Sequence, residues 1–173
     1  MDADDISLLK EISLYVGKRD EDIVAWPLKD TSGAKEYGTG TIKIENASDT
    51  PNGRFGHGLL VSPSSTLQAH FSGANFVSWW MRPTTIVTDI CEVIGSTDRV
   101  LVRVEGNDLV MSAASKTERA STLMTLQDGN NYNVSVFYAS GNTKVYIRCL
   151  ESKDEAFVEL SADIGSLSGI KYV

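Results

Sequence analysis

The sequence predicts an all-β protein, an antiparallel β-sandwich preceded by a short N-terminal α-helix. From residue 23 onward, apolar or alternating runs of about five to nine residues follow one another, as is typical of strands. Turn signals rich in Gly, Asn and Asp separate these runs roughly every 8–12 residues. After residue 40 no segment has the period of a helix, which excludes folds that alternate helices with parallel strands.

The N-terminal segment 4–16 is predicted to be a helix because its apolar residues repeat with a period of 3.6. The residues that share this face are Leu8, Leu9, Ile12, Tyr15 and Val16. A helix this short is marginal alone, so we expect the apolar face to dock on a partner or on the sandwich. We therefore predict a docking helix over 1–18 and a β-sandwich domain over 19–173.

The predicted strands follow in order along the chain. They cover residues 23–28, 41–45, 58–61, 66–71, 75–82, 86–94, 98–105, 108–113, 122–126, 132–139, 144–150 and 156–160. Tight hairpins are expected at Glu105–Asp108 and Ser140–Asn142, because Gly and Asn tolerate positive φ. A third turn is expected at Asp128–Asn131.

Length and charge narrow the class of protein. A chain of 173 residues can bury a sufficient core as one domain. Its net charge of −7 argues against nucleic-acid partners and against an anionic membrane surface. The acidic N-terminal residues do not resemble a signal peptide, and no apolar run is long enough to span a membrane. We therefore expect synthesis in a cytoplasm.

The two cysteines, Cys91 and Cys149, each lie in a strand-like run. They are far apart in sequence and have no neighbouring His, so a metal site is not expected. Buried thiols are the favoured interpretation, because free Cys behaves as a small apolar residue. A disulfide remains the alternative.

Four sequence segments appear in an order that is similar to one known family. They are Ile23–Gly33 with Asp-x-Ser-Gly, Asn52–Leu59 with Gly-Arg-x-Gly, Phe76–Pro83 with Ser-x-Trp, and the paired runs of Asn131–Ile147. Together they resemble laminin-G-like domains, which implies a concanavalin-A-like jelly roll. The resemblance implies that Trp80 is the core tryptophan and that Trp79 faces the other way. The family's calcium ligands have no counterpart here, so no metal or cofactor is expected.

The sequence shows no recognisable catalytic set. Glycosidases of this fold carry their carboxylates as Glu-x-Asp-x-x-Glu or a close relative, and no such string occurs. Glu155 and Glu159 share one strand face, which we interpret as a solvated face. The only histidines, His57 and His70, are interpreted as turn and sheet residues. We therefore expect that the chain is not an enzyme and that it has no catalytic residues.

The first functional hypothesis is a structural or interaction protein of a phage virion, such as a decoration, fibre or tail protein. It would dock through the helix 1–18 onto other structural proteins or onto further copies of itself in a homo-oligomer. The helix face, the absence of catalytic residues and the absence of an export signal favour this hypothesis. It implies a location on the virion.

The alternative is a carbohydrate-binding, lectin-like module for attachment to a host surface or a glycan. An aromatic platform and loop amides would form its site. The predicted residues are Trp79, Asn130, Asn131 and Asn142. Trp79 has a second interpretation, as packing beneath the helix or against a neighbouring subunit.

Overall fold

The computed structural model describes residues 14–17, 23–26, 32, 40–51, 58–62, 64–83, 89–114, 116–121, 126–127, 129–139 and 141–172. These residues form two large antiparallel sheets and a small hairpin. The six-stranded sheet runs in the order β14 (Glu155–Ser161), β13 (Asn142–Cys149), β12 (Tyr132–Ala139), β7 (Phe76–Met81), β1 (Leu14–Gly17) and β2 (Ile23–Trp26).

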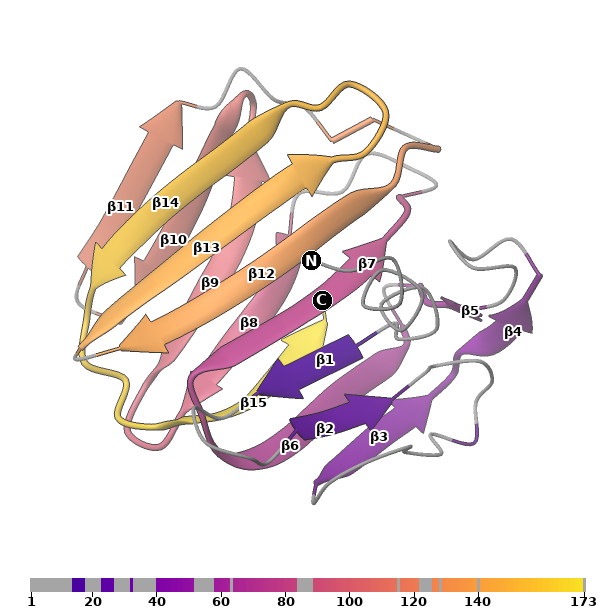
Figure 1. Ribbon diagram of the computed structural model, residues 1–173, viewed down its shortest axis with the longest axis horizontal. Coiled ribbons are helices and arrows are strands. Elements are labelled where there is room, and N and C mark those ends of the chain that lie inside the picture. The colour runs from indigo at the N-terminus through magenta and orange to yellow at the C-terminus, as the bar shows by residue number, and fades with distance from the viewer. Residues whose placement is uncertain are drawn as a thin grey trace, which may run out of the picture.

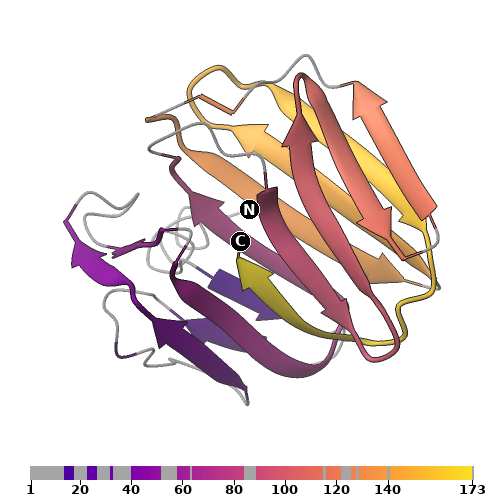
Figure 2. The ribbon, with the colours of Figure 1, turned by 180° about the vertical axis from the view of Figure 1, so that it is seen from behind.

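The second sheet has seven strands and lies behind the first (Figure 1). Its order is β11 (Lys116–Ser121), β10 (Asp108–Ala113), β9 (Arg99–Glu105), β8 (Asp89–Gly95), β15 (Leu167–Tyr172), β6 (Thr66–Ala74) and β3 (Thr41–Glu45). Figure 2 shows this sheet from its own side. The hairpin pairs β4 (Ser48–Thr50) with β5 (Gly58–Leu60). The prediction of an all-β antiparallel sandwich is confirmed.

The predicted tight turns are present where the sequence placed them. Gly106 joins β9 to β10 with a φ of 62°, and Gly141 precedes β13 with a φ of 79°. Glycine adopts this left-handed conformation without the steric penalty of a Cβ atom. Both glycines therefore let consecutive strands reverse within a few residues, which fixes the registers of β9 with β10 and of β12 with β13.

The N-terminal part of the sandwich differs from the sequence prediction. Leu8, Leu9 and Ile12 lie outside the described residues, so the helix over 4–13 has no structural description. Tyr15 and Val16, assigned to its last turn, instead lie in β1, which pairs with β2 and with β7. Backbone hydrogen bonds to strands on both sides stabilise the extended conformation of this segment, although its apolar residues have helical spacing. Aromatic and β-branched residues also favour strands. The described end of segment 1–18 is thus part of the sheet.

The core lies between the two sheets and is formed by alternate residues of each strand. In β14, for example, Ala156, Val158 and Leu160 are buried whereas the intervening residues are exposed. Cys91 and Cys149 are also buried, and both are free thiols. Burial in an apolar environment raises the pKa of the Cys91 thiol far above its usual value. The thiol interpretation is thus confirmed, and the disulfide alternative is wrong.

Trp79 belongs to this core, which corrects its sequence assignment. Its side chain is only 3% exposed, and its ring meets the ring of Tyr172 from the opposite sheet edge-on, with centroids 5.1 Å apart. Trp80 is the next residue of β7 and points to the outer face. The alternation of the two tryptophans was predicted, but the assignment of core and surface was reversed.

We expect Trp79→Ala to lower the free energy of unfolding by about 3–5 kcal/mol, because it empties a large site between the sheets. Trp80→Ala, one residue along the same strand, should cost no more than about 1 kcal/mol. Urea unfolding followed by circular dichroism measures both variants. Equal losses for the two variants would contradict the assignment of Trp79 to the core.

Candidate functional site

The outer face of the six-stranded sheet carries an unusual set of side chains for a solvated surface. The cross-strand registers arrange its outward residues in rows that run perpendicular to the strands. One row contains Phe157, Tyr146, Ser135 and Ser78, from β14, β13, β12 and β7 respectively. The next row on one side contains Glu159, Lys144, Phe137 and Phe76, and the row on the other side contains Glu155, Arg148, Asn133 and Trp80.

Three short polar side chains occupy the middle of this face, and we call Ser78, Asn133 and Ser135 the polar floor. The Ser78 and Ser135 hydroxyl oxygens lie 3.0 Å apart, and the Ser135 hydroxyl donates to Asn133 Oδ1 over 3.1 Å. Asn133 Nδ2 donates to Ser78 Oγ and to the backbone oxygen of Trp79, each over 3.1 Å. The bond to the backbone and the mutual bonds hold the three side chains in fixed positions.

Aromatic side chains lie in the same row as the polar floor and in the rows next to it. We call this set the aromatic rim, which consists of Phe76, Trp80, Phe137, Tyr146 and Phe157. Phe137 and Phe157 are 44% and 49% exposed, high fractions for large apolar side chains. The rings of Phe76 and Phe137 pack together with centroids 4.7 Å apart. The floor residues have shorter side chains than the aromatic residues beside them.

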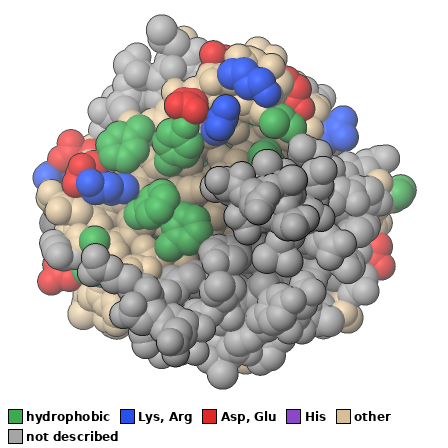
Figure 3. Space-filling view, in the orientation of Figure 1, with side chains coloured by type: hydrophobic (Ala, Val, Ile, Leu, Met, Phe, Trp, Pro, Cys, Tyr) green, Lys and Arg blue, Asp and Glu red, His purple; other side chains and the backbone are tan. Residues whose placement is uncertain are grey.

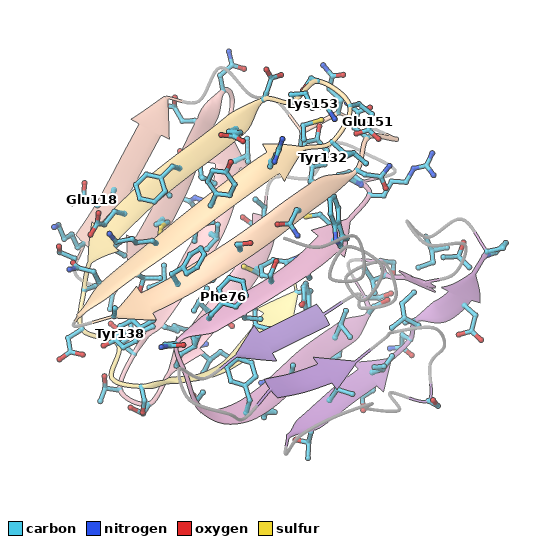
Figure 4. All side chains as sticks on the ribbon, in the orientation of Figure 1. Phe76, Glu118, Tyr132, Tyr138, Glu151 and Lys153 are labelled. Carbon is cyan, nitrogen blue, oxygen red and sulfur yellow. The ribbon has the colours of Figure 1, made fainter. Side chains whose placement is uncertain are left out.

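Figure 3 looks directly at this face, with hydrophobic side chains gathered beside charged ones over β12–β14. Figure 4 shows Phe76 projecting from the same face, whereas Tyr132 and Glu151 lie near the end where β12 begins. The face therefore combines hydrogen-bonding groups with apolar rings beside them.

The charges on this face are paired across strands. Lys144 Nζ lies 3.4 Å from Glu159 Oε2, and Arg148 Nε lies 3.4 Å from Glu155 Oε1. Partial burial raises the pKa of Tyr146, as does the hydrogen bond between its hydroxyl and the Glu155 carboxylate. Tyr146 is consequently a neutral hydrogen-bonding group at physiological pH.

The asparagines predicted as ligand-binding residues do not form one site. Asn130 and Asn131 precede β12, whereas Asn142 begins β13 at the other end of the same hairpin. Asn131 Nδ2 donates to Glu151 Oε1 over 2.8 Å, and Ser161 Oγ donates to Asn142 Oδ1 over 2.6 Å. Each of these two amides thus links neighbouring segments of the chain through a hydrogen bond.

The carboxylates on the outer face do not form a hydrolytic pair. Glu155 and Glu159 are four residues apart on one extended strand, which separates them by about 13 Å. Inverting glycosidases need a separation of at most about 9.5 Å, and retaining ones less. Within the described part of the chain, no cluster of His, Cys, Asp and Glu could hold a metal ion. Across the same residues, no helix is long and apolar enough to cross a membrane.

No protein-family model matches the sequence, and no curated protein matches it. Solved structures do share its fold. Domain 4 of AbnA, a GH43 extracellular arabinanase from Geobacillus stearothermophilus solved in complex with arabinotriose, is similar with a TM-score of 0.53 and 17% identity. That similarity covers 94% of this chain and 82% of the domain.

The enzymatically active domain of tailspike protein 2 from bacteriophage CBA120 has a TM-score of 0.54 and 12% identity. The match covers 78% of this chain and 25% of the tailspike chain, so the present chain spans about a quarter of that protein. The full-length form of this tailspike is similar too, with a TM-score of 0.52, 11% identity and coverage of 78% and 23%. These likenesses show the fold.

The comparisons correct the prediction that the chain is not an enzyme. The same fold is present in a tailspike domain described as enzymatically active and in a domain of an arabinanase. That prediction depended on the absence of a familiar carboxylate string. Since catalytic groups can come from residues distant in sequence, the absence of one string does not place the chain outside the enzymes.

Sequence reasoning overlooked the polar floor and the aromatic rim, although a local signal was present. Residues of the floor and the rim occur at every second position in Phe76-x-Ser78-x-Trp80 and in Asn133-x-Ser135-x-Phe137. This spacing places each set on one face of a strand. The signal was missed because Trp79 was assigned to the surface. That assignment places Phe76, Ser78 and Trp80 on the buried face of β7 and not on its outer face.

We expect Asn131→Ala to raise the pKa of Glu151 back toward its usual value. The hydrogen bond donated by the Asn131 side chain is the main cause of the lowered pKa of this carboxyl group. An NMR titration of the Glu151 side chain measures the change. Asn142→Ala is the matched control and should leave the pKa of Glu151 unchanged, because Asn142 lies at the other end of the hairpin.

Proposed function

We propose that the outer face of the six-stranded sheet binds carbohydrate, through the polar floor and the aromatic rim. The chain would then be a carbohydrate-binding β-sandwich of the laminin-G-like, concanavalin-A-like kind. The observation that carries this proposal is the hydrogen-bonded group of Ser78, Asn133 and Ser135 with half-buried and exposed rings beside it. A large exposed apolar patch commonly marks an interaction surface.

The chemistry of sugars fits both parts of this face. A sugar ring has faces of C–H groups, which are attracted to the electron-rich faces of aromatic rings. Its edge carries hydroxyl groups, which need partners that both donate and accept hydrogen bonds. Serine hydroxyls and the asparagine amide offer both capacities. A ligand of this kind would bond with the floor while its ring faces pack against the rim.

The comparisons support the proposal through the fold. The arabinanase domain that covers most of this chain was solved with arabinotriose, so a sandwich of this shape does accommodate an oligosaccharide. The order of the four laminin-G-like segments in the sequence supports the same class of protein. The fold shared with the tailspike supports a place on a phage tail or virion, where the chain would contact other structural proteins.

Affinity gel electrophoresis with arabinan, xylan, mixed-linkage β-glucan, galactan and polygalacturonate tests the proposal. We expect at least one polysaccharide to retard the wild-type protein. Tyr146→Ala should weaken that binding about tenfold, which corresponds to the loss of one stacking contact of about 1.4 kcal/mol.

Leu60→Ala is the matched control for this experiment. Leu60 is 49% exposed but belongs to the β4–β5 hairpin, away from the proposed site. Its removal should leave retardation unchanged, provided that circular dichroism shows both variants to be folded. Wild-type protein that no polysaccharide retards, or a Leu60→Ala effect as large as that of Tyr146→Ala, would contradict the proposal.

A further inference from the structure

The outward positions of β7, β12, β13 and β14 carry four charged side chains, two of each sign. Lys144 and Arg148 belong to β13, whereas Glu155 and Glu159 belong to β14. Each cation contacts one acid on the neighbouring strand over 3.4 Å. These four charges sum to zero, so the outward positions described on β7, β12, β13 and β14 supply no surplus cation with which to attract an acidic ligand.

The two ion pairs lie on either side of two rings of the aromatic rim. The Tyr146–Phe157 pair of the rim lies between them, because Arg148 opposes Glu155 on one side and Lys144 opposes Glu159 on the other. A ligand stacked on these two rings would lie beside both carboxylates. An acidic sugar would meet their repulsion and would have to compete with them for the two cations. An uncharged sugar meets neither cost.

The arrangement of the rim indicates the length and direction of the ligand. Tyr146 and Phe157 lie on β13 and β14, whereas the tilted pair of Phe76 and Phe137 lies on β7 and β12. The polar floor on β7 and β12 lies alongside the second pair and next to Tyr146. From β14 to β7 there are three strand spacings, or about 14 Å. One sugar ring is too small to contact both Phe157 at one end of this span and Phe76 at the other.

We infer that the ligand of this face is an uncharged oligosaccharide that lies across the strands from β14 to β7. It would contact the Tyr146–Phe157 pair and the Phe76–Phe137 pair and direct hydroxyl groups toward the polar floor. This inference rests on the proposed carbohydrate binding. A protein partner fits less well, because Lys, Glu and Ser, which this face carries among its rings, are depleted in protein interfaces. A nucleic acid would require unpaired cations.

The charge of the ligand is tested with polygalacturonate as the acidic probe and arabinan, xylan, β-glucan and galactan as uncharged probes. We expect retardation only by uncharged polysaccharides, unchanged within about threefold between about 0.05 and 0.5 M NaCl, because no charge attraction is screened. The double variant Arg148→Gln/Glu155→Gln should bind within about threefold of wild type. Binding of polygalacturonate that weakens with salt and is lost in Arg148→Gln would overturn the inference.

The length of the ligand is tested by calorimetry with the mono- and trisaccharide units of the uncharged polysaccharide that binds. If arabinan binds, the probes are arabinose and arabinotriose. We expect the trisaccharide to bind at least about tenfold more tightly, since it reaches a second aromatic pair. Phe76→Ala and Phe157→Ala should each remove most of this advantage. Equal binding of the two sugars, or an effect of only one variant, would overturn the extended placement.

These outcomes separate the two proposals. Binding of an acidic polysaccharide or of a monosaccharide alone overturns the inference about the ligand and leaves carbohydrate binding intact. If no polysaccharide binds to the folded wild-type protein, carbohydrate binding itself is wrong and the inference falls with it. Leu60→Ala again serves as the control, because it lies outside both aromatic pairs.

Discussion

The alternation of side chains across the six-stranded sheet is the constraint on which the core and the candidate site both depend. Burial of Val77 and Trp79 between the sheets places Phe76, Ser78 and Trp80 on the other side of β7. A shift of one residue in the register would exchange these two sets. The same pairing of β12 with β7 therefore completes the core on one side and brings the polar floor together on the other.

The second sheet supports this arrangement from behind. Its inner residues complete the core, and Tyr172 of β15 contacts Trp79 across the sandwich. β15 lies between β6 and β8, where a Cβ atom on Gly169 would be only 2.7 Å from the carbonyl oxygen of Ala69. Glycine allows this close approach of two backbones.

Local signals predicted much of this fold. The expected bounds of β3, β10 and β12 agree with the structure, because alternating residues and Gly-containing turns define them over short distances. β11 and β15 were not predicted. The strand Lys116–Ser121 is almost entirely polar, and the run Leu167–Tyr172 contains a glycine that resembles a turn signal. β11 becomes a strand by pairing with β10, whose apolar pattern is stronger. β15 becomes a strand by pairing with β6, which is distant in sequence.

The sequence by itself determined that the chain forms antiparallel strands joined by tight turns, and that Trp79 and Trp80 face opposite ways. These properties depend on the backbone and on residues a few positions apart. Only the tertiary structure decided which tryptophan is buried and which polar and aromatic side chains meet. That choice depends on contacts between residues more than fifty positions apart, such as Ser78 with Ser135, and no local pattern contains this information.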